Sequence, residues 1–179
     1  MRKRTVRAAT VSLALLALVA GGAYVYRLTQ STCCISGEHG DYLIVPDFTL
    51  PDREGVPITL SKVRAPVRIV NFWASWSPYS HDELLTLARL KDVYGSDVEV
   101  LAIDRDTNEN DGRSYLNMLG IVDKVTFVFD ANDTYFKQVG GFNMPETMFI
   151  NERGEIVAHT HGPMRYEEVE VQVRQLLGR

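Results

Sequence analysis

The sequence predicts an α/β fold in which helices flank a central, mixed β-sheet. Two observations lead to this prediction. Through the middle of the chain, short apolar runs alternate with amphipathic segments, a pattern typical of parallel strands connected by helices. Near each end, two short strand-like segments surround a turn, and each pair predicts a β-hairpin. The expected order is a hairpin, an alternating strand–helix region, a second hairpin and a final helix.

Each element is assigned from its own residue pattern. Short runs rich in apolar and β-branched residues predict strands at 46–50, 56–60, 67–73, 98–103, 125–129, 144–150 and 155–159. Apolar residues at helical spacing predict helices at 78–95, 114–119, 133–139 and 167–177. Residues 104–111 are expected to form a polar loop. The run 67–73 is almost continuously apolar, which predicts a strand covered on both faces.

The N-terminus predicts a membrane anchor. Four basic residues within positions 2–7 precede an uncharged, apolar stretch at 8–26. That stretch is long enough to cross a bilayer, and the charges before it predict an N-terminus in the cytoplasm. We therefore expect a single-pass protein of the cytoplasmic membrane with an extracytoplasmic domain. A cleaved signal peptide is the alternative, because residues 20–23 are small.

The chain divides into three expected parts. Residues 1–28 form the basic stub and the transmembrane segment, residues 29–45 form a linker rich in Ser, Thr and Gly, and residues 46–179 form the folded domain. The formal net charge is −4, and no basic stripe with interleaved aromatic residues is present in the sequence. We therefore expect no nucleic-acid partner.

Residues 71–80, which read Asn-Phe-Trp-Ala-Ser-Trp-Ser-Pro-Tyr-Ser, bear most directly on function. An apolar strand leads into a helix, with Pro78 near the helix start, where its missing N–H costs little. This junction resembles the active-site turn of the thioredoxin superfamily, in particular its membrane-anchored TlpA/ResA-type branch. The resemblance covers residues 46 to about 178 and implies a thioredoxin-like fold with an extra N-terminal β-hairpin. That family has Cys-x-x-Cys at this turn, and here both cysteine positions are serine, Ser77 and Ser80.

The resemblance places the family's catalytic positions at Ser77, Ser80, Asn71 and Glu83. Thiol–disulfide exchange needs a thiolate and a sulfur to attack, and a helix dipole of about half a charge does not ionise a serine hydroxyl at neutral pH. We therefore expect Ser77 and Ser80 to be inert in redox chemistry and to cap the helix. Asn71 is expected to hydrogen-bond internally, and Glu83 to complement the helix dipole as a first-turn acid.

The same resemblance implies a surface that binds an extended peptide segment of a client protein. Residues 141–147 match the family loop that holds a cis-proline, and the residue before that proline offers backbone groups to a peptide. Phe142 could add to an apolar patch around this loop. We expect Tyr79 and Met144 to be exposed. The substrate-binding residues implied are Trp76, Pro78, Tyr79, Met144 and Pro145.

Two other patterns are not assigned a function. Ser80-His81-Asp82 contains the residue types of a catalytic triad, but neighbours on a helix point in different directions. His159 and His161 are expected on one side of a strand, yet two ligands alone do not make a closed zinc site. We therefore expect a solvated strand end, no metal site and no cofactor.

Cys33 and Cys34 are the only cysteines, and both lie in the linker. An oxidising compartment permits disulfides, so a dimer linked through this pair and a vicinal redox pair are both possible. The leading interpretation is a peptide- or partner-binding module without disulfide chemistry. The alternative is a TlpA/ResA-type thiol–disulfide oxidoreductase whose catalytic cysteines were substituted or whose role is taken by Cys33-Cys34. A peroxidase-like redoxin would need a peroxidatic cysteine at the helix start, where the sequence has none.

Overall fold

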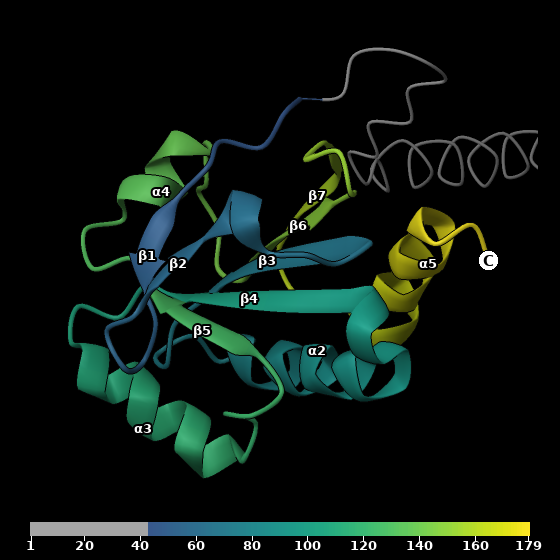
Figure 1. Cartoon of the computed structure of the whole chain (residues 1–179). Helices are drawn as coiled ribbons and strands as arrows, with labels where there is room; N and C mark the ends of the chain where they lie inside the picture. The colour runs from purple at the N-terminus through teal and green to yellow at the C-terminus, as the bar shows by residue number, and fades with distance from the viewer. Residues whose placement is uncertain (1–42) are drawn as a thin grey trace, which may run out of the picture. The chain divides into compact units, whose positions relative to one another are not determined.

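The computed structural model describes residues 43–179. A five-stranded mixed sheet has the strand order β5-β4-β3-β6-β7, and β1 and β2 form a separate two-stranded sheet (Figure 1). The strands are β1 (Thr49–Pro51), β2 (Pro57–Thr59), β3 (Val67–Trp73), β4 (Val98–Asp104), β5 (Thr126–Phe129), β6 (Glu146–Ile150) and β7 (Ile156–His161). The helices are α2 (Ser80–Tyr94), α3 (Glu109–Leu119), α4 (Thr134–Gln138) and α5 (Tyr166–Leu176), with 3-10 turns η1 (Leu60–Lys62) and η2 (Gly95–Asp97).

The strand directions determine which loops meet. β3, β4 and β5 run parallel, whereas β6 is antiparallel to β3, and β7 is antiparallel to β6. The carboxyl ends of β3 and β4 therefore lie at the same edge of the sheet as the beginning of β6. In the register, Phe72 of β3 is opposite Glu146 of β6. The segment after Trp73 and the segment before Glu146 consequently leave the sheet side by side.

Apolar side chains cover both faces of the sheet. On one face, buried residues such as Ile69 and Val100 pack with α2, α3 and α5. On the other face, Val70 and Leu101 pack with α4 and the β1–β2 hairpin. Figure 1 shows α2 and α3 below the sheet in the view, with α4 above it. Every residue of β3 is buried, which confirms the prediction of a strand covered on both faces.

The predicted order of elements is confirmed, including the N-terminal hairpin, in which β1 and β2 pair antiparallel. Several boundaries shift by one to three residues, and the largest difference is at α3, which begins at Glu109, inside the predicted polar loop at 104–111. The Asn108 side chain accepts a hydrogen bond from the Asn110 N–H, so a capped first turn forms from polar residues. Gly120 then ends the helix in the left-handed conformation.

The membrane segment predicted at 8–26, the cysteine pair and most of the linker lie outside the described residues. Within the described part of the chain, no helix combines the length and apolar character that a membrane span needs. The last linker residues already belong to the folded unit, since Ile44 forms a β-bridge with Glu155 and Val45 is buried.

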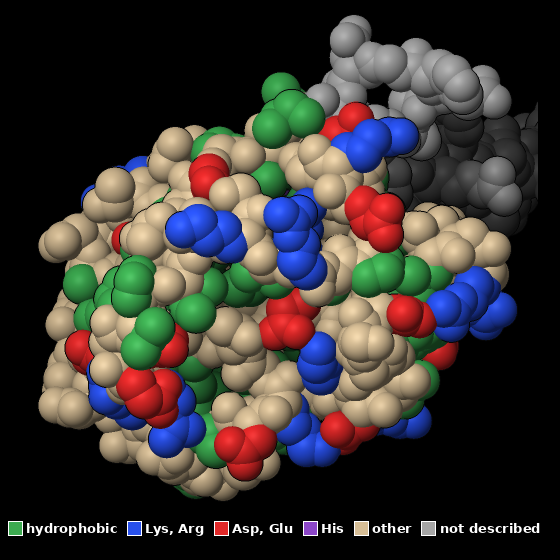
Figure 2. All heavy atoms as spheres, viewed as in Figure 1, with side chains coloured by type: hydrophobic (Ala, Val, Ile, Leu, Met, Phe, Trp, Pro, Cys, Tyr) green, Lys and Arg blue, Asp and Glu red, His purple; other side chains and the backbone are tan. Residues whose placement is uncertain are grey.

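Charged side chains of both signs are interspersed on the surface. Figure 2 shows Lys and Arg side chains among Asp and Glu side chains on the face in view. Ion pairs within the folded unit include Lys91 with Glu99 and Lys124 with Asp92. On this face of the described residues, opposite charges therefore alternate and do not build a continuous basic surface.

Candidate functional site

The serine tetrad, residues 77–80, lies where β3 ends and α2 begins. Ser77 and Ser80 are buried, with exposed fractions of 3% and 0%. Pro78 is exposed, as are Tyr79 and the neighbouring Trp76, which confirms the predicted exposure of Tyr79. The loop therefore turns its hydroxyl side chains inward and its aromatic side chains outward.

The hydrogen bonds of the tetrad correct the prediction that its serines cap the helix. Tyr79 precedes the first helical residue, and its side chain makes no capping hydrogen bond. Ser80 is the first helical residue, and its Oγ accepts a hydrogen bond from the Ala74 N–H at 3.4 Å. The backbone closes the turn, because the Ser77 N–H donates to the Ala74 carbonyl and the Ser80 N–H donates to the Ser77 carbonyl. The Ser80 side chain is thus used to hold the end of β3.

A buried polar cluster joins α2 to the sheet next to the tetrad. Asn71 Nδ2 donates to Glu83 Oε1 at 3.2 Å and to Thr147 Oγ1 at 2.9 Å. The Thr147 hydroxyl in turn donates to Glu83 Oε1, and the Met164 N–H donates to Glu83 Oε2 at 3.1 Å. The prediction that Asn71 hydrogen-bonds internally is therefore confirmed.

The sequence predicts Glu83 as a first-turn acid that complements the helix dipole, but the structure also buries it among hydrogen-bond donors. It stands in the first turn of α2, but only 1% of it is exposed. Burial raises the pKa of its carboxyl group to about 7, although hydrogen bonds from Thr147 and Met164 act in the opposite direction. A carboxyl group with this pKa can exchange a proton near neutral pH. Ser77 and Ser80 carry hydroxyl groups, which do not ionise in this range.

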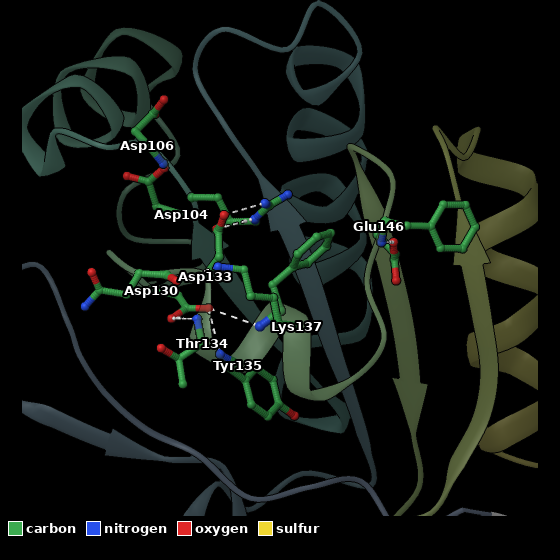
Figure 3. Close-up of polar contacts among 12 residues, drawn as sticks. Asp104, Asp106, Asp130, Asp133, Thr134, Tyr135, Lys137 and Glu146 are labelled. Carbon is green, nitrogen blue, oxygen red and sulfur yellow. Dashed lines mark hydrogen bonds and ion pairs between the residues drawn. The ribbon is translucent and has the colours of Figure 1, made fainter.

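A second buried acidic cluster supports the tetrad loop from the end of β4. Asp104 ends the strand and Asp106 follows it, close together in Figure 3. Asp106 Oδ2 accepts the Ser75 N–H at 2.9 Å, and the Asp106 N–H donates to Asp104 Oδ1 at 2.9 Å. Burial is the main cause that raises the pKa of Asp104 to about 8. The sequence predicts both acids only as part of a polar loop. Their position directly after an apolar strand would have indicated that they lie at the edge of the sheet.

The loop before β6 contains the predicted cis peptide bond, between Met144 and Pro145. Pro145 is buried, and Phe142 is 74% exposed. Met144 is half-buried, which corrects the prediction of an exposed side chain. The loop is drawn onto the sheet because Glu146 Oε2 accepts the N–H groups of Phe142 and Asn143, both at 3.1 Å. The Met144 N–H donates to Asn143 Oδ1 at 2.9 Å.

Glu146, labelled in Figure 3, follows the cis-proline and is fully buried. Neighbours on a strand point to opposite faces, so Glu146 faces away from the side on which Thr147 contacts Glu83. His159 Nε2 lies 2.6 Å from Glu146 Oε1, and His161 Nδ1 lies 3.1 Å from Glu146 Oε2. The two histidines share one side of β7 as predicted. Their carboxylate partner was missed, because it comes from the adjacent strand.

The triad-like sequence has no triad geometry. The Ser80 side chain bonds to the Ala74 N–H, whereas His81 Nδ1 lies 3.4 Å from the Tyr115 hydroxyl. The two side chains therefore face different partners, as predicted.

Comparison with known proteins identifies the family. Residues 43–159 match the model of the AhpC/TSA family. The chain is 25% identical over 170 residues to thiol-disulfide oxidoreductase ResA of Geobacillus kaustophilus, covering 94% of each protein. It is 27% identical over 124 residues to sporulation thiol-disulfide oxidoreductase A of Bacillus subtilis, covering 68% of this chain and 74% of that protein.

A solved structure shows the same fold. The crystal structure of a protein assigned as thiol:disulfide interchange protein DsbE from Chlorobium tepidum matches with a TM-score of 0.70 and 25% identity. The match covers 80% of this chain and 100% of that one. The chain therefore belongs to the AhpC/TSA family, and it carries a thioredoxin-like redoxin domain homologous to the ResA and DsbE thiol-disulfide oxidoreductases.

Proposed function

We propose that this redoxin domain binds an extended peptide segment of a client protein and that its tetrad carries out no disulfide exchange. One observation supports the proposal: at Ser77 and Ser80, where the resemblance places the family's cysteines, the side chains are buried hydroxyl groups, while the aromatic residues beside them are exposed. A hydroxyl group neither attacks a disulfide usefully nor forms one. Recognition of a peptide by shape and hydrogen bonds needs no sulfur.

The surface proposed to bind the peptide lies between the tetrad loop and the loop before β6. Trp76 and Tyr79 are 65% and 59% exposed on the first loop, and Phe142 is 74% exposed on the second. Exposed aromatic side chains of this size are typical of interaction surfaces. The Met144 N–H is held by the side chain of Asn143, which is exposed. A peptide carbonyl can take the place of that side chain without leaving a donor unsatisfied.

Binding can be tested with reduced, carboxymethylated α-lactalbumin, an unfolded chain without free thiols. We expect the full-length protein to bind this probe and Tyr79→Ala to raise the Kd roughly tenfold or more, because tyrosine is among the residues that most often carry the binding energy of an interface. Fluorescence anisotropy of the labelled probe measures the Kd.

Met118→Ala is the matched control, since Met118 is 68% exposed on α3, which belongs to neither loop. Its Kd should stay within about twofold of the parent. Equal losses in Tyr79→Ala and Met118→Ala would argue against the proposed surface, as would a parent that does not bind.

The redox part of the proposal predicts that Ser77→Cys/Ser80→Cys confers disulfide reduction that the parent lacks. The frame around the tetrad keeps the buried acid Glu83, whose pKa of about 7 suits proton exchange with a thiol. Reduction of insulin disulfides by the full-length proteins measures the activity. Each protein is also prepared with Cys33→Ser/Cys34→Ser, so that the linker cysteines contribute to neither arm.

A thiol–disulfide oxidoreductase is the second candidate, and the adjacent cysteines Cys33 and Cys34 favour it. On that alternative the parent reduces insulin and Cys33→Ser/Cys34→Ser abolishes the activity. Reduction by the variant that lacks Cys33 and Cys34 would refute both proposals, because no sulfur nucleophile would remain.

We further propose that the apolar stretch at 8–26 holds the domain on the outer side of the cytoplasmic membrane. The positive charges before this stretch and the absence of charge within it support the proposal. Retention in the membrane fraction after an alkaline carbonate wash tests it, and release into the soluble fraction would contradict it. A dimer linked through Cys33 and Cys34 would appear as a doubled mass in non-reducing electrophoresis.

A further inference from the structure

Three potential metal ligands converge behind the loop that contains the cis-proline. Glu146 of β6 is paired directly with His161 of β7, and His159 lies on the same side of β7. One donor atom from each residue lies within 4.8 Å of the other two. The two imidazole rings are 4.4 Å apart between centroids. The register between β6 and β7 therefore brings together three potential ligands, of which β6 supplies one and β7 supplies two.

We propose that Glu146, His159 and His161 form a binding site for a divalent transition metal ion, with zinc as the representative ion. Zinc bonds of about 2.0–2.1 Å at tetrahedral angles place ligand atoms about 3.3 Å apart. The present separations, 2.6 Å between Glu146 Oε1 and His159 Nε2 and 3.1 Å between Glu146 Oε2 and His161 Nδ1, are close to this value. The ion would replace the proton that each imidazole now shares with the carboxylate.

The carboxylate is already oriented as a ligand. Glu146 Oε2 accepts two backbone N–H groups, from Phe142 and Asn143, which leaves Oε1 directed at His159. Outer hydrogen bonds of this kind fix the orientation of metal-binding side chains.

The composition of the set selects the class of ion. Two imidazole nitrogens and one carboxylate oxygen suit zinc and its first-row neighbours, whereas magnesium and calcium prefer sites made of oxygen. Three protein ligands leave one tetrahedral position for water. Ions can enter from the histidine side, because the side chains of His159 and His161 are 19% and 29% exposed while Glu146 is fully buried.

Occupancy of this site would act on the neighbouring loop. Glu146 follows Pro145 directly, and the ring of the exposed Phe142 lies 4.3 Å from the His161 ring between centroids. An ion bound to the carboxylate would fix both ends of the segment from Phe142 to Glu146. This inference is independent of whether the tetrad binds peptides or exchanges disulfides.

The test is a zinc titration of the full-length chain in a Cys33→Ser/Cys34→Ser background, which removes the thiols as competing ligands. Competition with a chromophoric zinc indicator gives the stoichiometry and the affinity. We expect one zinc ion per chain and at least a roughly tenfold weaker affinity in both His159→Gln and His161→Gln. His81→Gln is the matched control, since His81 lies on α2 near Tyr115, and it should bind as the parent does.

A second measurement keeps Glu146, His159 and His161 unchanged, so that its result does not depend on whether a histidine variant folds correctly. Of the four imidazoles in the sequence, two should shift their ring-proton NMR resonances when zinc is added, and assignment should identify them as His159 and His161. The inference is overturned by a parent that binds no zinc, by equal affinity in the three histidine variants, or by shifts confined to His39 and His81.

Discussion

A glycine inside α3 makes room for a buried acid. A Cβ atom on Gly112 would lie 1.8 Å from Asp104 Oδ2, so any side chain there would force the carboxyl group to move. Asp104 also accepts the N–H of Asp106, which in turn accepts the N–H of Ser75 before the tetrad. The space left by Gly112 therefore allows Asp104 to hold Asp106, and Asp106 in turn holds the backbone just before the tetrad.

Gly112→Ala is expected to lower the free energy of unfolding by about 1–3 kcal/mol, because overpacking displaces the Asp104 carboxyl group. At an exposed helix position the same change would stabilise by up to about 1 kcal/mol, so the sign is informative. Urea denaturation measures the difference. The loss should shrink in an Asp104→Ala background, where the carboxyl group is absent; an equal loss in both backgrounds would locate the strain elsewhere.

At the scale of elements, α4 depends on an acid that lies before its start. Asp130 accepts hydrogen bonds from the N–H groups of Thr134, Tyr135 and Phe136, at 3.0, 3.0 and 3.1 Å (Figure 3). Asp133, at the N-cap position, makes no capping hydrogen bond with its side chain. The helix has five residues, so the Asp130 carboxylate bonds to most of its first-turn donors.

Asp130→Ala should lower the free energy of unfolding by about 2 kcal/mol or more, because it leaves buried N–H groups without an acceptor. Thermal and urea unfolding measure the loss. Asp133→Asn is the control: it weakens the ion pair with Arg105, which in its partly exposed setting should contribute less than about 1 kcal/mol. A control that loses as much as Asp130→Ala would show that the capping interaction is not the cause.

Most elements were predictable because their signals are local. The apolar run of β3 and the glycines that end α2 and α3 stand in the sequence itself. The start of α3 was not predicted, because a capped first turn made of Asn, Glu and Asp looks like a loop in the sequence.

The residues of the candidate site could be predicted only where the family resemblance assigns a role to their positions. Asn71 and the tetrad fall into place on that basis, but the burial of Glu83 depends on contacts with Thr147 and Met164, far along the chain. The grouping of Glu146 with the two histidines depends on the register between β6 and β7, which composition does not specify.

At the scale of the whole molecule, buried acids set the dependence of stability on pH. The pKa values of Glu83 and Asp104 are raised to about 7 and about 8, mainly by burial. Between the unfolded values, near 4, and these folded values, the native state binds more protons than the unfolded state. Stability therefore falls as the pH rises through that interval. In the other direction, a hydrogen bond from Arg105 lowers the pKa of Asp133, whose contribution is lost as the pH falls below about 4.

The chain is therefore expected to be most stable near pH 4.5–5 and to lose stability towards pH 8. The loss attributable to Glu83 is on the order of 3 kcal/mol. Urea unfolding at pH values from 3 to 8, with a chelator present, measures the profile. Glu83→Gln and Asp104→Asn should each flatten the decline above pH 5. A parent that is most stable at pH 8, or variants with an unchanged slope, would contradict this assignment.

Successive side chains of β6 point to opposite faces of the sheet, so the number of residues between the cis-proline loop and β6 decides which side chain reaches which cluster. Glu146 and Thr147 serve opposite faces of the sheet, the first with the histidines and the second with Glu83. Deletion or insertion of one residue between the loop and β6 would exchange the two faces. A carboxylate would then enter the compartment that already holds Glu83, and a hydroxyl would face the imidazoles. Homologous sequences that keep both clusters should therefore vary in the residues of this segment but tolerate no change in its length.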